Sequence, residues 1–436
     1  MAINGSTVSL KTIYEEAVAL NMTNKIINAR DLLGQSALLL SIQKGHIQSA
    51  EHIIQLGANV NTAVTANDAQ NEGKTPLIEA SSHGYVSIVK RLLKEGAKIG
   101  KSQRDGTHAA YEAAQNGHLE VLRLLLQKDP NVADLKGKYE RTPLVSVAYN
   151  GHYNILEYLT SLSNVKIDAQ DKNGGHAAYY AASNGRLDVL KLLVQKDPNV
   201  ADLKGEKGRT PLVAAAENGR WNTVEFLTSF SNVTVDTKNE NGGHAVYYAA
   251  EQGKLDVLKL LVERNLNAAD LKGYKGKTPL VIAAENGHWN TVEFLISLSN
   301  VKVDTKNENG GHAADHAAWQ GKLDVLKLLV QKDPNVADLK GKNGRTPLIS
   351  AARKGHLDIV KYLTSLQNVN INSQDNKGLT ALVLAAYWNH PNIAQLLLKK
   401  GADASIKVYG KSALEWATVK EYTDVIKVFQ TQNNIQ

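Results

Sequence analysis

Four histidines recur at an interval of 68 residues through the middle of the chain, and their type and spacing make them the first candidates for chemistry. A regular row of imidazoles could bind metal ions or transfer protons, because the ring is a common metal ligand and titrates near neutral pH. The alternative is a structural role, in which each ring caps the start of a helix or bonds within its own repeat. The four residues are His108, His176, His244 and His312.

The spacing of these histidines favours the structural role. Packed helices lie about 8 to 10 Å apart, so histidines two repeats apart should be separated by roughly twice that distance. A zinc ion binds imidazole nitrogens at about 2 Å and cannot bridge such a gap. The chain also contains no cysteine, which removes disulfides, thiolate zinc sites and cysteine nucleophiles. We therefore expect no metal and no cofactor.

Two Gly-Lys-Thr sequences invite comparison with phosphate-binding loops. At residues 73–75 and 276–278, however, the glycine that such a loop needs five positions upstream is missing. Neither a His-Glu-x-x-His nor a Gly-x-Ser-x-Gly sequence occurs in the chain. No catalytic residue can be assigned, and we predict that the protein is not an enzyme.

The histidines belong to a pattern with a period of 34 residues in which two repeat types alternate. The second type opens with Thr-Pro-Leu. A threonine hydroxyl can accept a hydrogen bond from an unpaired N–H at a helix start, and proline in the first turn has no N–H to lose. Residues 208–240 show the unit, which consists of two short helices separated at Asn218-Gly219 and a turn-rich finger. The threonines are Thr142, Thr210, Thr278 and Thr346.

The Thr-Pro-Leu units resemble the ankyrin repeat family, whose Thr-Pro-Leu-His-x-Ala motif is matched at residues 74–80, 141–147, 209–215, 277–283 and 345–351. The tetratricopeptide family shares the period, but its Trp and Tyr pattern is missing. The resemblance covers about residues 34 to 430 as twelve units. It implies an all-α ankyrin-repeat solenoid of stacked helix-turn-helix units with short β-hairpin or turn fingers.

The ends of the chain depart from the repeat pattern, as the ends of a stacked array must. We expect N-terminal capping helices at residues 1–33, the repeat array at 34–409 and a C-terminal capping repeat at 410–436. Trp221 and Trp289 occupy a second-helix position that carries leucine in other units. That substitution pattern predicts that both indoles pack in the core.

The resemblance also implies that the first helices and fingers line a concave face that binds protein partners. Residues 187–205 and 323–341 are identical, whereas the first helices change from copy to copy, as a recognition surface would. Aromatic and arginine side chains often anchor interfaces, and we favour the stretch from Trp319 to Trp388. The alternative is that these rings partly cover neighbouring helices. The candidate partner-binding residues are Tyr149, Tyr180, Tyr248, His316, Trp319, Arg353, Tyr387 and Trp388.

Every second finger is rich in basic residues. Such tips could meet an acidic partner, nucleic acid or another anionic surface, although a solvated turn is the more common explanation. The basic finger tips are Lys138, Arg141, Lys207, Arg209, Lys275, Lys277, Lys342 and Arg345.

Composition agrees with a folded repeat protein. The chain has 436 residues, is 43% hydrophobic and 21% charged, and carries a modest formal charge of +7. No basic and then apolar segment opens the chain, and no run approaches the roughly 18 apolar residues that span a bilayer. We expect a cytoplasmic monomer with a protein partner, no membrane insertion, and nucleic acid as the less favoured ligand. Export as an effector, through a signal that leaves no such pattern, stays an alternative.

Overall fold

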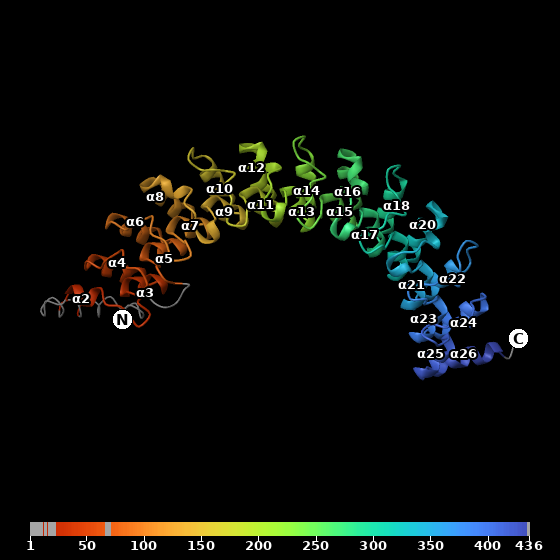
Figure 1. Ribbon diagram of the computed structural model, residues 1–436. Helices are drawn as coiled ribbons and strands as arrows, with labels where there is room; N and C mark the ends of the chain where they lie inside the picture. Colours follow the sequence, from red (N-terminus) through yellow and green to blue (C-terminus); the bar gives the residue numbers. More distant parts are fainter. Residues whose placement is uncertain (1–11, 13–14, 16–22, 66–70, 434–436) are drawn as a thin grey trace. The chain divides into compact units, whose positions relative to one another are not determined.

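The computed structural model describes residues 12, 15, 23–65 and 71–433 (Figure 1). The chain divides into two compact units, Met1–Ala215 and Ala216–Gln436, and each is described by itself. The expected N-terminal capping helices fall largely outside the described residues, which include only the short α2 (Thr23–Ile27) in this region.

Unit 1 alternates first and second helices along the chain, and the division from unit 2 falls within α13 (Pro211–Glu217). Its first helices are α3 (Ala37–Gln43), α5 (Pro76–Ser82), α7 (Ala109–Gln115), α9 (Pro143–Asn150) and α11 (Ala177–Asn184). Its second helices are α4 (Ile47–Gln55), α6 (Val86–Lys94), α8 (Leu119–Lys128), α10 (Tyr153–Thr160) and α12 (Leu187–Lys196).

Unit 2 continues the same alternation from α14 (Trp221–Thr228) onward. Its first helices are α15 (Ala245–Glu251), α17 (Pro279–Asn286), α19 (Ala313–Trp319), α21 (Pro347–Lys354), α23 (Ala381–Tyr387) and α25 (Ala413–Val419). Its further second helices are α16 (Leu255–Arg264), α18 (Trp289–Ser297), α20 (Leu323–Lys332), α22 (Leu357–Leu363), α24 (Pro391–Lys399) and α26 (Thr423–Asn433).

Within each unit the first helices form one row and the second helices another (Figure 1). Neighbouring first helices such as α17, α19 and α21 pack directly on one another. Alanine pairs such as Ala317-Ala318 are fully buried at these contacts, so the helices can approach closely. The described residues contain isolated β-bridges and no sheet. The all-α repeat fold is therefore confirmed, with turns rather than hairpins as fingers.

Helix starts follow the two repeat types. The hydroxyl of Thr142 accepts a hydrogen bond from the N–H of Val145 at 3.4 Å. In the other type, Nδ1 of His108 accepts from the N–H of Tyr111 at 3.3 Å, and its Nε2 contacts the carbonyl oxygen of Leu135 at 3.1 Å. Because Nδ1 accepts, Nε2 carries the proton and donates it.

The same pair of bonds occurs at His176 and His244, so the structural role is confirmed for three of the histidines. His312 keeps the bond to the carbonyl oxygen of Leu339 without a side-chain cap. All four rings are fully buried. Burial lowers the pKa of His108, His176 and His244 to about 4, and it lowers the pKa of His312 as well.

The expectation that Trp221 and Trp289 pack in the core is wrong. Trp289 is 52% exposed, and Trp221 is half-buried. Both begin a second helix, where the leucines of other units, such as Leu119, are also only partly covered. The periodicity identifies this position at the start of the second helix, where only one side of the residue contacts the core. Leucine is small enough to be largely covered there, whereas the larger indole of tryptophan extends into solvent.

Every second finger ends in a one-turn 3₁₀ helix, as at η3 (Lys138–Glu140) and η9 (Lys342–Gly344). The second residue of each turn has a left-handed backbone, with φ of 59° at both Tyr139 and Asn343. The N–H of Gly341 then donates to the carbonyl oxygen of Arg345 at 2.7 Å and closes the turn. This closure places the basic residue directly before the next first helix.

Candidate partner-binding site

Four of the predicted partner-binding residues lie together on unit 2. The guanidinium carbon of Arg353 lies 5.4 Å from the ring centre of Trp319 and 5.5 Å from that of Trp388, within the range of cation–π attraction. Tyr387 meets Trp388 edge-on at 5.5 Å. These four residues, which we call the aromatic cluster, come from the ends of three successive first helices, α19, α21 and α23.

The aromatic cluster extends further than the sequence indicated. Trp416, on α25 in the C-terminal capping repeat, packs edge-on against Tyr387 at 5.4 Å. Trp388 is 47% exposed, whereas Trp319, Arg353 and Tyr387 are half-buried. The rings therefore partly cover their neighbours and remain partly accessible. This arrangement combines the two alternatives from the sequence, namely accessible interface residues and rings that cover neighbouring helices.

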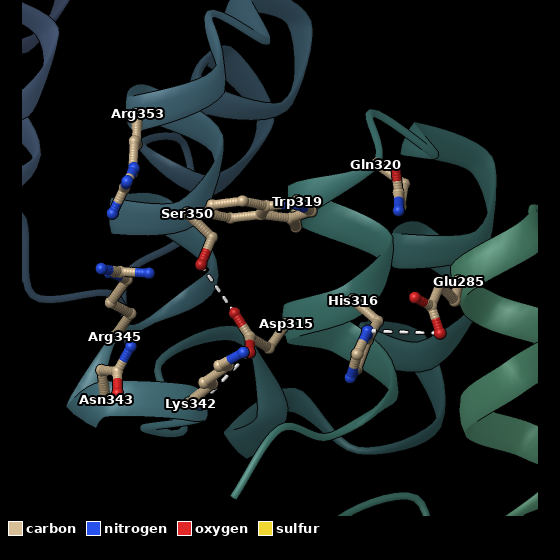
Figure 2. A pocket seen from close by; sticks show the side chains of 10 residues that line it. All are labelled: Glu285, Asp315, His316, Trp319, Gln320, Lys342, Asn343, Arg345, Ser350 and Arg353. Atoms are coloured by element: carbon tan, nitrogen blue, oxygen red, sulfur yellow. Dashed lines mark hydrogen bonds and ion pairs between the residues drawn. The ribbon is translucent and has the colours of Figure 1, made fainter. Parts of the chain in front are cut away.

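A pocket of about 350 Å³ adjoins the aromatic cluster (Figure 2). We call it the cationic pocket. Side chains from α17, α19, α21 and the η9 finger form its walls. The charged and aromatic residues that line it are Glu285, Asp315, His316, Trp319, Lys342, Arg345 and Arg353.

The acidic groups of this pocket are already engaged within the protein. Glu285 forms an ion pair with Lys277, and Nδ1 of His316 lies 3.6 Å from its Oε2. The interaction with His316, which outweighs the effect of burial and is reinforced by Lys277, lowers the pKa of Glu285 to about 2. His316 is held in turn by the side-chain amide of Asn307, at 3.0 Å from its Nε2.

Asp315 ties the finger to the neighbouring helix. The hydroxyl of Ser350 donates to Oδ1 of Asp315 at 2.6 Å, and the backbone N–H of Lys342 donates to Oδ2 at 3.3 Å. Gly341 must lack a side chain here, because a Cβ would lie 2.6 Å from Oδ2 of Asp315. Sequence reasoning did not select Asp315, although a carboxylate where other units carry Tyr111, Tyr179 and Tyr247 was a visible signal.

The basic groups of the pocket are less well compensated. Nε of Arg345 lies 3.5 Å from Oδ2 of Asp375, and both atoms are buried without a hydrogen bond. Arg353 points toward Arg345 (Figure 2). Among the described residues no carboxylate forms an ion pair with Arg353. Burial and the charge of Arg345 lower the pKa of Arg353, while Asp375 acts in the opposite direction.

The remaining predicted aromatic residues lie outside this pocket. Tyr149 is 42% exposed and meets Tyr180 edge-on at 5.5 Å. Tyr180 itself is only 5% exposed, so it does not offer a ring to a partner. Tyr248 is half-buried, and its hydroxyl oxygen accepts a hydrogen bond from the amide of Asn239 at 3.0 Å.

The basic finger tips do not act as a uniform set. Four of them form ion pairs inside the protein: Lys138 with Asp105, Arg141 with Asp171, Lys277 with Glu285 and Arg345 with Asp375. Lys207, Lys275 and Lys342 are exposed, and Arg209 is half-buried. Tips such as Arg141 and Arg345 thus have an electrostatic role within the protein.

Across residues 23–65 and 71–433 no helix has the length and apolar character needed to cross a membrane. Within the same part of the chain no group of three or more His, Asp or Glu side chains is arranged to hold a metal ion.

Paired helices stacked in a fixed register define a helical repeat protein. A model of the family described as ankyrin repeats (3 copies) matches the chain from end to end, in overlapping segments at residues 2–103, 96–171, 160–239, 224–307, 246–339, 298–375, 314–408 and 365–436. The chain belongs to the ankyrin repeat family, whose members are generally protein-protein interaction modules and typically not enzymes. A search of curated proteins found no match.

Proposed function

We propose that this protein is a non-enzymatic scaffold or adaptor that binds a partner protein on the first-helix face of unit 2. This face consists of α15, α17, α19, α21, α23 and α25 with the fingers between them. The observation that carries the proposal is the aromatic cluster, in which Trp319, Arg353, Tyr387 and Trp388 contact one another and remain accessible. Trp, Tyr and Arg are the side chains that most often dominate binding energy.

Rigid presentation is the proposed mechanism. Arg353 is held between two indoles, and its helix α21 packs on both neighbouring first helices. A side chain that is already ordered loses little conformational entropy when a partner binds, and each flexible side chain that must be ordered costs about 0.5 to 1.5 kcal/mol. The face would act as an adaptor, an inhibitor or an effector surface according to the partner it holds, in a protein that we propose to be a cytoplasmic monomer.

Affinity capture from a cell lysate tests this proposal. The Trp388→Ala variant should lose the captured partner, because truncation of a central aromatic anchor costs about 2 kcal/mol or more, which is roughly 30-fold in affinity. Trp289→Ala is the matched control, since this indole is similarly exposed but lies on a second helix. Quantitative mass spectrometry would compare the proteins retained by each variant. Retention of every partner by Trp388→Ala, with loss in Trp289→Ala, would contradict the proposal.

Salt dependence separates this function from binding of nucleic acid or another anionic surface through the finger tips. Binding by phosphate neutralisation falls steeply as salt rises from 50 to 200 mM. Capture by the aromatic cluster should survive that change. The ion pairs of Lys138, Arg141, Lys277 and Arg345 support this expectation, because each of these groups already has an acidic partner within the protein.

A further inference from the structure

The cationic pocket contains two arginines, Arg345 and Arg353, whose guanidinium groups point toward each other (Figure 2). Arg345 is paired on one side only, at Nε, with Asp375. Arg353 has two indoles as neighbours and no ion pair with any described residue. Two like charges in a half-buried site repel each other, and an anion placed between them would remove that cost.

The acidic residues of the pocket cannot supply this anion. The carboxylate of Glu285 is committed to Lys277 and His316, and that of Asp315 accepts hydrogen bonds from Ser350 and the η9 backbone. Lys342 adds a third cation, which is exposed. The uncompensated charge of the pocket is therefore positive.

A single negative charge suits the pocket better than a double one. The carboxyl groups of Asp315 and Glu285 lie on its wall, and the lowered pKa of Glu285 keeps that group charged, so a dianion would meet repulsion that a monoanion largely avoids. Arginine forks match the two oxygens of a carboxylate. Trp319 offers a flat apolar wall beside both guanidinium groups, at 5.8 Å from Arg345 and 5.4 Å from Arg353, against which methylene groups can pack.

The aromatic cluster continues from this pocket toward the C-terminal end of the face. Arg353 links the indole of Trp319 to that of Trp388, and Tyr387 leads on to Trp416. A charged site that opens onto a row of rings fits an extended peptide, in which an acidic side chain is followed by an apolar one.

We propose that the cationic pocket binds an acidic peptide segment of a partner protein, with one Asp or Glu carboxylate held by Arg345 and Arg353 and a neighbouring apolar side chain packed on Trp388. This assignment rests on the proposed function, because it names the chemistry that the first-helix face of unit 2 recognises.

Selection from a randomised peptide library, displayed on phage and panned against the full chain, provides the probe. The selected peptides should carry Asp or Glu next to an apolar residue. A fluorescein-labelled copy of one such peptide is then compared with versions that carry Gln or phosphoserine in place of the acid. Loss of the carboxylate should weaken binding about 10- to 100-fold, which is the usual range for a charge-assisted hydrogen bond.

Variants of the protein test the same contact from the other side. Arg353→Gln should weaken binding of the acidic peptide by a similar factor. This variant should bind the acid and Gln peptides with equal affinity. Lys361→Gln is the matched control, since it removes one charge from an exposed lysine on the second helix of the same repeat and should change affinity less than twofold. Circular dichroism melts establish that both variants fold.

The outcomes separate this inference from the proposed function. Five tryptophans allow labelling with 5-fluorotryptophan, so that ¹⁹F resonances report contact at Trp319 and Trp388. If the peptides shift those resonances but the acid and Gln versions bind with equal affinity, the carboxylate site is wrong and the first-helix face remains the proposed binding surface. Peptides that shift neither resonance would overturn both. Tighter binding of the phosphoserine peptide than of the acid peptide would overturn the choice of a carboxylate.

Discussion

Arg141 in unit 1 and Arg345 in unit 2 occupy the same position of the repeat, 204 residues apart, yet their surroundings differ. Arg141 donates from Nε to Asp171 at 3.1 Å and from Nη2 to the hydroxyl oxygen of Tyr180 at 3.0 Å. Tyr180 completes the network by donating to Asp171 at 2.6 Å.

At the corresponding positions of unit 2, Leu384 stands where Tyr180 does and Arg353 stands where Tyr149 does. Arg345 thus keeps its acidic partner Asp375 but loses the hydroxyl, and it gains a second cation as neighbour. These two first-helix differences, together with Asp315 and Trp319 where unit 1 has Tyr111 and Gln115, distinguish the open, positively charged pocket from the closed structural ion pair. The scaffold that holds both arginines is unchanged.

The largest expected effect is a loss of stability in acid, which acts on both units through their buried histidines. The folded state lowers the pKa of His108, His176 and His244 from 6.5 to about 4. Between these pH values the unfolded chain binds more protons, so stability is complete above about pH 6.5 and falls as the pH drops toward 4. Each histidine should cost roughly 3 kcal/mol at pH 4. Urea denaturation at pH 7 and pH 4 would measure the sum.

The variant His176→Thr tests whether the histidines cause this acid effect. Threonine is the helix cap of the alternate repeats, as at Thr142, so it can keep the capping bond without titrating. The unfolding free energy of this variant should fall less between pH 7 and pH 4, by the contribution of one histidine. An unchanged dependence would assign the acid effect to other groups.

Neutralising the acid of each arginine pair sharpens the comparison. Asparagine occupies the same turn position at Asn239 and Asn307, where its side-chain oxygen accepts the same backbone bonds. Asp171→Asn should therefore keep the turn but leave the charge of Arg141 without its acidic partner. The unfolding free energy should fall by about 3 kcal/mol. Asp375→Asn should cost less, about 1 kcal/mol, because its ion pair with Arg345 is longer, at 3.5 Å, and Oδ2 makes no hydrogen bond to lose. Equal losses of unfolding free energy in urea would show that the two arginine pairs contribute alike.

The smallest effects should come from the hydroxyl that distinguishes the two regions. Burial, together with the hydrogen bond to Asp171, raises the pKa of Tyr180, so its hydroxyl stays protonated and able to donate. Tyr180→Phe should cost about 1.5 kcal/mol, the range for removing one partner of a buried bond to a charged group. The control Tyr149→Phe, with an exposed ring, should change the free energy of unfolding by less than about 0.5 kcal/mol. A larger loss in the control would contradict the assigned role.

Much of the fold was predictable because its signals are local. Thr-Pro-Leu and His-Ala-Ala mark helix starts through bonds that span three residues, as between Thr142 and Val145. Trp289 escaped correct prediction because a 34-residue period identifies equivalent positions without showing how deeply each is buried. A tryptophan that replaces leucine at the start of a helix can point toward the core or toward solvent.

The candidate site was predictable only in part, since its bonds join distant residues. Trp319, Arg353, Tyr387 and Trp388 could be aligned by register, and the structure places them together. The burial of Tyr180 depends on Arg141, which lies 39 residues upstream, and no local pattern reveals that bond.

The same limit explains why Arg345 was grouped with the solvated finger tips. Arg345 belongs to the cationic pocket because the finger closes beside α19 and α21, and its link to Trp319 and Arg353 is spatial rather than sequential. Asp315 was the one clue within a helix, as a charge at a position that is otherwise aromatic.

Residues 187–205 and 323–341 are identical and form the same elements, α12 with η4 (Pro198–Ala201) and α20 with η8 (Pro334–Ala337). A chain that crossed from one copy to the other would omit 136 residues, or four repeats, and would carry an unaltered sequence through the junction. A deletion or duplication of that span would therefore keep the register of the repeats. The second helices and fingers change little from repeat to repeat, so first helices with different exposed residues pack against similar neighbours. Exchange of whole repeats would therefore combine different first helices without altering the packing between repeats.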